Sequence, residues 1–211
     1  MHSISSIRTW TSGEWLSLWD ADSSVEHLSI DTRSLENPAQ SAFIALSTSV
    51  RDGHSFLADA YNKGVRNFIV SQKVDTTYFP DSNFILVRDT ISALQQIATA
   101  HRRLFHLPVI GITGSNGKTV VKEWLGTLLN TSFSIVRSPK SYNSQIGVPL
   151  SVWQISKDHR LGIFEAGISQ TGEMEHLEKI IQPTIGIFTN IGEAHSDGFL
   201  TMRQKINEKL L

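Results

Sequence analysis

A glycine-rich segment in the middle of the chain carries the residues best suited to bind phosphate. It reads Gly-Ile-Thr-Gly-Ser-Asn-Gly-Lys-Thr over residues 111–119, between an apolar run and a helix-like stretch. Such a turn lets backbone amides approach an anion closely. Lys118 would add a positive charge near the terminal phosphates, and the Thr119 hydroxyl would bind Mg²⁺. The strict pattern has a further glycine where Ile112 stands, so the segment matches a variant loop. The candidate phosphate-binding residues are Gly114, Ser115, Asn116, Gly117, Lys118 and Thr119.

Two later strands are also predicted to end in polar residues. Glu165 follows the apolar run 161–164, and a segment ending in His195 follows the run 185–188. In open parallel sheets, ligands bind beyond the carboxyl ends of the strands. A carboxylate one strand away from a phosphate loop is well placed for Mg²⁺, which prefers oxygen ligands. The same position favours a functional role for His195, although the chain has eight histidines.

The elements that must position these residues alternate as strands and helices. Strands are expected at residues 28–30, 42–46, 67–70, 84–87, 109–112, 133–136, 161–164 and 185–188. Helices are expected at residues 55–64, 89–105, 146–155, 173–181 and 201–211, and after the phosphate loop. Trp10, Trp15 and Trp19 are expected to pack a small N-terminal lobe.

These elements predict an α/β fold with two domains. Residues 1–107 form a small α/β domain, and residues 108–211 form a truncated P-loop domain with a parallel sheet. The boundary follows from Pro108, which cannot continue the preceding helix. The strand–helix pattern stops early after the loop, so we expect the chain to be an N-terminal piece of a longer protein.

Composition excludes several functional classes. The formal net charge is −1, so no polybasic surface favours nucleic acid or anionic lipid as a partner. The chain has no cysteine, which excludes disulfides and thiolate metal sites. The N-terminus has no signal-peptide core, and no apolar run is long enough for membrane insertion. We therefore expect a cytoplasmic protein.

Three segments together resemble the central domain of the Mur ligases, which join amino acids or dipeptides to the UDP-linked muramic acid precursor of peptidoglycan. They are the phosphate loop, Phe-Glu-Ala-Gly at 164–167, and Thr-Asn-Ile-Gly-Glu-Ala-His-Ser-Asp-Gly-Phe at 189–199. The segment 141–150 and the turns at 31–33 and 52–54 most resemble the branch of the family that adds D-Ala-D-Ala to UDP-N-acetylmuramoyl-tripeptide. Residues 64–70 resemble versions fused to a C-terminal alanine racemase.

The resemblance implies an ATP- and Mg²⁺-dependent enzyme that activates a carboxylate as an acyl phosphate for attack by an amine. It implies that Lys118 and the loop hold ATP with Asn190, and that Asn143 contacts the substrate. It also implies that Lys209 is carbamylated, although the family's following Gly-Glu is replaced here by two leucines. The implied metal ligands are Thr119, Glu165 and His195. The implied catalytic residues are Lys118, His195 and Lys209. The residues implied to face the uridine nucleotide are Thr32, Arg33 and His54.

Other interpretations remain open at this point. One is a different Mur-type ligase or the related folate polyglutamate ligase, which lacks a first domain of this kind. Another is a non-ligase P-loop nucleotide switch, although the Asn-Lys-x-Asp signature of guanine-specific switches does not follow the loop. Because ligases of this family have a further C-terminal domain, we expect this chain alone to be inactive.

Overall fold

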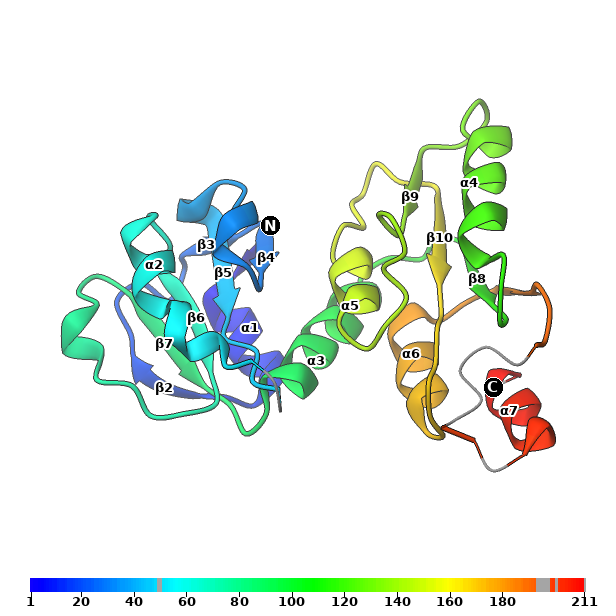
Figure 1. Cartoon of the computed structure of the whole chain (residues 1–211). Helices are drawn as coiled ribbons and strands as arrows, with labels where there is room; N and C mark the ends of the chain where they lie inside the picture. Colours follow the sequence, from blue (N-terminus) through cyan, green and yellow to red (C-terminus); the bar gives the residue numbers. More distant parts are fainter. Residues whose placement is uncertain (49–50, 193–197, 200, 211) are drawn as a thin grey trace. The chain divides into compact units, whose positions relative to one another are not determined.

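The computed structural model describes residues 1–48, 51–192, 198–199 and 201–210, and it divides the chain into two compact units, Met1–Ile97 and Ala98–Leu211. Both units are α/β, as predicted (Figure 1). The division falls inside helix α3 (Thr90–Arg102). The domain boundary at residues 107 and 108 stays a prediction. No helix in the described ranges has both the length and the apolar character that a membrane span requires.

The first unit is built on a five-stranded sheet in the order β2-β7-β6-β5-β4. Strands β4 to β7 run parallel to one another, and β2 runs antiparallel to β7. The strands are β2 (Glu14–Ser17), β4 (His27–Ser29), β5 (Ser41–Ile44), β6 (Asn67–Val70) and β7 (Asn83–Leu86). A separate two-stranded antiparallel sheet is formed by β1 (His2–Ser3) and β3 (Ser24–Val25). The helices are α1 (Ile4–Thr11), α2 (Leu57–Asn62) and the start of α3.

Aromatic side chains fill the core of this first unit. Phe43, Phe68 and Phe84 occupy matching positions on three adjacent strands and are fully buried. The Phe68 and Phe84 rings stack with centroids 4.5 Å apart. The tryptophans contribute less than predicted, because Trp19 is 54% exposed.

The second unit is built on a four-stranded, fully parallel sheet in the order β11-β8-β10-β9. This confirms the predicted parallel sheet. The strands are β8 (Val109–Thr113), β9 (Ile135–Arg137), β10 (Leu161–Glu165) and β11 (Ile185–Phe188). The helices are α4 (Lys118–Leu129), α5 (Gly147–Val152), α6 (Glu173–Ile181) and α7 (Met202–Lys209).

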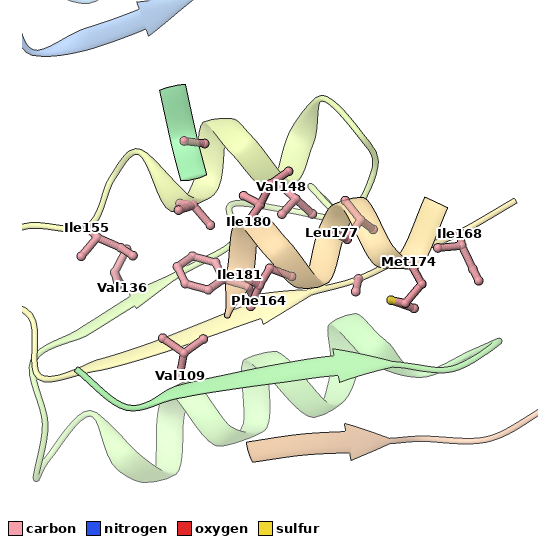
Figure 2. Close-up of a cluster of buried hydrophobic side chains, with 13 residues drawn as sticks. Val109, Val136, Val148, Ile155, Phe164, Ile168, Met174, Leu177, Ile180 and Ile181 are labelled. Carbon is pink, nitrogen blue, oxygen red and sulfur yellow. The ribbon is translucent and has the colours of Figure 1, made fainter. Parts of the chain in front are cut away.

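Side chains that alternate along the strands give this sheet two buried faces. Val109 and Phe164 point to the face that α5 and α6 cover, in the cluster that Figure 2 shows. Ile110 and Ile163 point to the opposite face, against apolar residues of α4. The strands are therefore apolar on both sides, as expected for a sheet between two helical layers.

Helices α3 and α5 each end three residues earlier than predicted. Helix α3 stops at Arg102, three residues before Phe105, because the Arg102 side chain donates to the Phe105 carbonyl and, from Nε, to that of Ile181 at 2.8 Å. Helix α5 ends at Val152 and is followed by a turn to Ile155.

Candidate functional site

The three polar segments predicted at strand ends lie at one edge of the second unit's sheet. Strand β8 continues into the phosphate loop, and β10 ends at Glu165, which pairs in register with Ile112 of β8. Strand β11 pairs Phe188 with Thr113 and leads into Thr189. The carboxyl ends of β8, β10 and β11 therefore bring the loop, the glutamate and the 189–192 segment together.

The glycines of the phosphate loop are required by its backbone. Gly114 has φ +132° and Gly117 has φ +81°, values that side-chain-bearing residues rarely adopt. A Cβ on Gly114 would lie 2.1 Å from Oγ1 of Thr189. Gly117 immediately precedes α4, so the loop leads directly into a helix N-terminus, where free amides attract anions.

Asn190 fastens the loop to the neighbouring strand. Its carbonyl oxygen accepts from the Ser115 amide at 2.9 Å, and its Oδ1 accepts from the Asn116 amide at 3.0 Å. The Thr189 hydroxyl donates to the Asn116 carbonyl at 2.6 Å. Two loop amides are thus engaged by Asn190, so the amides at the start of α4 are the ones best placed for phosphate.

Lys118 folds back onto its own loop. Its ammonium donates to the carbonyl of Gly114 at 2.8 Å, and the Lys209 ammonium reaches the same oxygen at 3.4 Å. Burial lowers the pKa of Lys118, and the charge of Glu165 partly opposes that shift. Both lysines line a cavity of about 300 Å³ together with Asn143.

The two predicted magnesium ligands in the described part of the chain touch each other. The Thr119 hydroxyl donates to Oε2 of Glu165 at 3.1 Å, and Nδ2 of Asn143 lies 3.4 Å from the same oxygen. Glu165 is fully buried, and its Oε1 lies 2.9 Å from the Lys122 ammonium, so Oε2 is the oxygen beside the Thr119 hydroxyl. A buried carboxylate oxygen beside a hydroxyl offers the oxygen ligands that Mg²⁺ prefers. In the described ranges, no cluster of three or more His, Cys, Asp or Glu side chains forms a complete metal site.

Lys209 lies on α7 and is buried. Its burial, with smaller contributions from the nearby Lys118 and Lys205 charges, lowers its pKa from 10.5 to about 8. The neighbouring Glu208 accepts from the amides of Gly172 and Met174 at 2.7 and 3.2 Å, which ties α7 to the start of α6. His195, the other predicted catalytic and metal-binding residue, lies outside the described residues.

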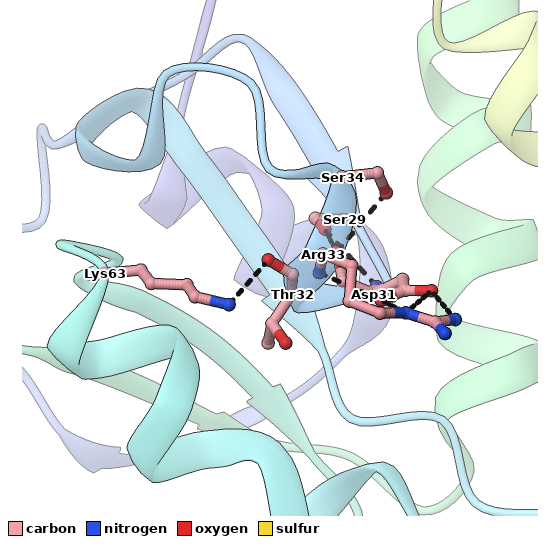
Figure 3. A network of polar contacts seen from close by, with 6 residues as sticks. All are labelled: Ser29, Asp31, Thr32, Arg33, Ser34 and Lys63. Atoms are coloured by element: carbon pink, nitrogen blue, oxygen red, sulfur yellow. Dashed lines mark hydrogen bonds and ion pairs between the residues drawn. The ribbon is translucent and has the colours of Figure 1, made fainter.

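In the first unit, Thr32 and Arg33 lie directly after β4, in a short 3-10 turn that Asp31 caps. Figure 3 shows the Arg33 guanidinium paired with the Asp31 carboxylate and Lys63 donating to the Thr32 carbonyl at 3.1 Å. The pairing lowers the pKa of Asp31 to about 2, mainly through the hydrogen bond from the Arg33 side chain. The Arg33 side chain is nonetheless 77% exposed.

His54 has both ring nitrogens occupied. Nδ1 lies 2.6 Å from Oδ1 of Asp52, and Nε2 accepts from the Ser71 amide at 3.1 Å. An Nε2 that accepts carries no proton, so the ring is the neutral Nδ1–H tautomer donating to Asp52. Its contacts join the turn after β5 to the end of β6.

Sequence reasoning gave no role to one buried residue at this site, Lys122. It lies three residues after Thr119 on α4, and its ammonium is 2.9 Å from Oε1 of Glu165. The only signal in the sequence is that spacing, since residues three apart share a helix face.

Comparison with known proteins finds a family for the part of the chain that carries this site. Residues 112–211, from inside β8 onwards, match the family model described as "Mur ligase middle domain". A curated UDP-N-acetylmuramoyl-tripeptide--D-alanyl-D-alanine ligase from Synechocystis is 35% identical over 195 residues, which are 92% of this chain and 42% of that protein. The ligase of the same name from Bacillus subtilis is 36% identical over 81% of this chain and 37% of its own length.

Solved structures extend the similarity to both units. Crystal structure I of MurF from Acinetobacter baumannii has a TM-score of 0.88 and 28% identity, over 99% of this chain and 45% of that one. The MurF ligase from Thermotoga maritima in complex with ADP has a TM-score of 0.76 and 28% identity, over 87% of this chain and 42% of that one. The chain thus spans about two fifths of the length of the curated relatives it matches. The family match starts in the strand that carries the phosphate loop, and the relatives extend the similarity through the first unit. The second unit of this chain therefore belongs to the Mur ligase family, as its middle domain.

Proposed function

We propose that the chain forms the precursor-binding domain and the first part of the ATP-binding domain of a ligase that joins D-Ala-D-Ala to UDP-N-acetylmuramoyl-tripeptide. The observation that carries this proposal is similarity over 92% of the chain to a ligase of that name. The site supports it independently, because a phosphate loop and a buried carboxylate meet at one sheet edge. We place the protein in the cytoplasm, and fusion to an alanine racemase is part of the proposal.

ATP would bind at the start of α4. The free amides there and the Lys118 ammonium supply the positive potential that its phosphates need. Lys118 would leave the Gly114 carbonyl and turn toward the terminal phosphate. The ADP bound in the Thermotoga maritima relative supports a nucleotide in this family's site. Asn190 would contribute by holding the loop in its phosphate-binding shape.

Thr119 and Glu165 would hold Mg²⁺, and His195 would help to hold a second ion. The metal supplies charge neutralisation between ATP and the incoming carboxylate. Asn143 contacts Glu165 and lines the cavity with Lys118, so it would meet both the metal site and the substrate.

The reaction would have two steps. An oxygen of the tripeptide's terminal carboxylate attacks the γ-phosphorus, the bond to ADP breaks, and an acyl phosphate forms. The amine of D-Ala-D-Ala then attacks the acyl carbon, loses a proton, and expels inorganic phosphate. Lys118 stabilises the charge that develops on the transferred phosphoryl group.

Lys209 would carry a carbamate. A lysine with a pKa near 8 is partly neutral at cellular pH, and only the neutral amine adds CO₂. The product is an anion, which attracts Mg²⁺ where an ammonium would repel it.

The first unit would bind the uridine nucleotide of the precursor. Thr32 and the exposed Arg33 lie at the carboxyl end of β4, where a parallel sheet offers its ligand site. His54, whose ring is fully engaged, would shape the adjacent turn at β5.

Calorimetric titration of this chain with UDP-N-acetylmuramoyl-tripeptide tests the proposal. We expect saturable binding that plain muramic acid does not reproduce. A parallel assay with ATP and D-Ala-D-Ala is expected to give no amide from this chain and amide from the whole protein. A whole protein that hydrolyses ATP but forms no amide would instead favour a nucleotide switch.

A further inference from the structure

Lys122 is a buried cation to which the proposed reaction gives no task. Its side chain is fully buried, which is rare for a lysine unless the ammonium is paired. It lies on the same face of α4 as Thr119. A buried cation next to a proposed metal ligand needs an explanation, because it competes with Mg²⁺ for the same carboxylate.

The ammonium of Lys122 holds the segment that follows β9. It donates to the carbonyl of Ser138 at 2.8 Å and to that of Lys140. The Ser138 hydroxyl oxygen accepts a hydrogen bond from the Glu165 amide at 3.3 Å. This segment leads to Asn143, so Lys122 connects α4 to the strand and the loop on either side of the site.

The two carboxylate oxygens of Glu165 have different neighbours, and the Lys122 ammonium is the neighbour of one of them. Oε1 lies 2.9 Å from Nζ of Lys122, as a contact between opposite charges and not a directed hydrogen bond. Oε2 faces the Thr119 hydroxyl. The carboxylate of Glu123 also lies 3.3 Å from Nζ, so the cation has a second anionic neighbour.

We propose that Lys122 is a positioning residue, which fixes the Glu165 carboxylate so that one oxygen is presented toward Thr119 for a divalent cation. The inference rests on the proposed function, because it takes Thr119 and Glu165 as the metal ligands. Residues that orient metal ligands typically contribute about 10- to 100-fold to metal affinity. Lys122 would orient Glu165 from α4, through its contact with Oε1.

The first test compares Lys122→Met, which keeps much of the side-chain length without the charge, with Lys157→Met at an exposed lysine of the same unit. Mn²⁺ dissociation constants are measured by electron paramagnetic resonance on the whole protein with ADP. We expect Lys122→Met to weaken Mn²⁺ binding about 10- to 100-fold, and Lys157→Met to leave it unchanged. ADP affinity in EDTA is expected to be the same in all three proteins. Unchanged Mn²⁺ affinity in Lys122→Met would overturn the proposal.

A double-mutant cycle with Glu165→Gln separates positioning from a general structural role. If Lys122 acts through Glu165, adding Lys122→Met to Glu165→Gln causes no further loss of Mn²⁺ affinity. Additive losses, with weakened ADP binding in EDTA, would assign Lys122 to the fold alone. If Lys122→Met does not fold, folding of the double variant supports the proposal, because the unpaired buried carboxylate is then gone. Failure of both to fold would overturn it.

Crystal structures of the wild-type and Lys122→Met proteins keep this inference separate from the proposed function. We expect the Glu165 carboxylate to turn away from Thr119 in the variant. A carboxylate that stays in place would refute the positioning role. A wild-type protein without metal-dependent nucleotide binding would refute the proposed function, while the Glu165 position would still decide the role of Lys122.

Discussion

The ammonium groups of Lys118 and Lys209 share one acceptor, the carbonyl oxygen of Gly114, at 2.8 and 3.4 Å. One neutral carbonyl oxygen offsets little of the repulsion between two ammonium groups, because each positive charge disfavours the protonated form of the other lysine. An anion at this place would relieve that repulsion. The pair therefore prepares the carboxyl edge of the sheet for phosphate, and each lysine gives a prediction of its own.

Lys118→Ala is expected to reduce turnover of the whole protein by about 100-fold or more. Removing one preorganised donor from a developing negative charge typically has an effect of about that size. Steady-state kinetics with saturating ATP measure it, and Lys157→Ala, at an exposed position, is the matched control. A Lys118→Ala enzyme with the wild-type rate would remove Lys118 from the active site.

Carbamate formation at Lys209 is expected to rise as the pH passes through about 8. Below that pH the amine is protonated and has no lone pair for CO₂, and near pH 8 about half of it is neutral. An ordinary lysine, with a pKa of 10.5, is half neutral only at pH 10.5. ¹³C NMR in labelled bicarbonate measures the carbamate, and Lys209→Met should lack the signal.

The same titration has an internal check in Lys118→Met. The Lys118 charge is one cause of the lowered pKa of Lys209, so its removal moves that pKa back toward 10.5. The onset of carbamate formation should shift to higher pH. An onset that stays near pH 8 would mean that burial and the Lys205 charge lower the pKa of Lys209 without help from Lys118.

The sequence predicted the parts of the site that depend on local pattern. Glycine spacing indicated the phosphate loop, and the apolar run before Glu165 indicated the end of a strand. Parallel pairing of the two strands was then enough to bring the loop and Glu165 to the same end of the sheet. The burial of Lys122 depends on carbonyl groups in another segment, which no spacing reveals. The end of α3 at Arg102 is likewise set by a contact 79 residues away in the sequence. Lys209 was found only through family resemblance, because a charged helix face ordinarily means exposure to solvent.

Arg33→Ala is expected to weaken binding of UDP-N-acetylmuramoyl-tripeptide by about tenfold or more. Asp31 holds the exposed guanidinium at the carboxyl end of β4, where it is available as a charged hydrogen-bond donor to the precursor. Calorimetry on this chain measures the change, with Arg103→Ala at another exposed arginine as the control. Equal affinities for Arg33→Ala and the wild type would exclude a precursor contact at this turn.

Glu208→Ala is expected to lower the free energy of unfolding by about 1–3 kcal/mol. The Glu208 carboxylate accepts hydrogen bonds from the Gly172 and Met174 amides at the positive end of α6, and its loss leaves both donors without this acceptor, the buried Met174 amide among them. Glu208→Gln keeps an acceptor oxygen and should lose less. Glu175→Ala, which removes an exposed carboxylate from the same turn of α6, should leave the free energy of unfolding nearly unchanged, because exposed ion pairs contribute little. Urea unfolding measures all three, and hydrogen exchange at the amides of Gly172 and Met174 should speed up in Glu208→Ala alone. Faster exchange in Glu175→Ala as well would show that charge near the helix end, and not the bridge from α7, protects these amides.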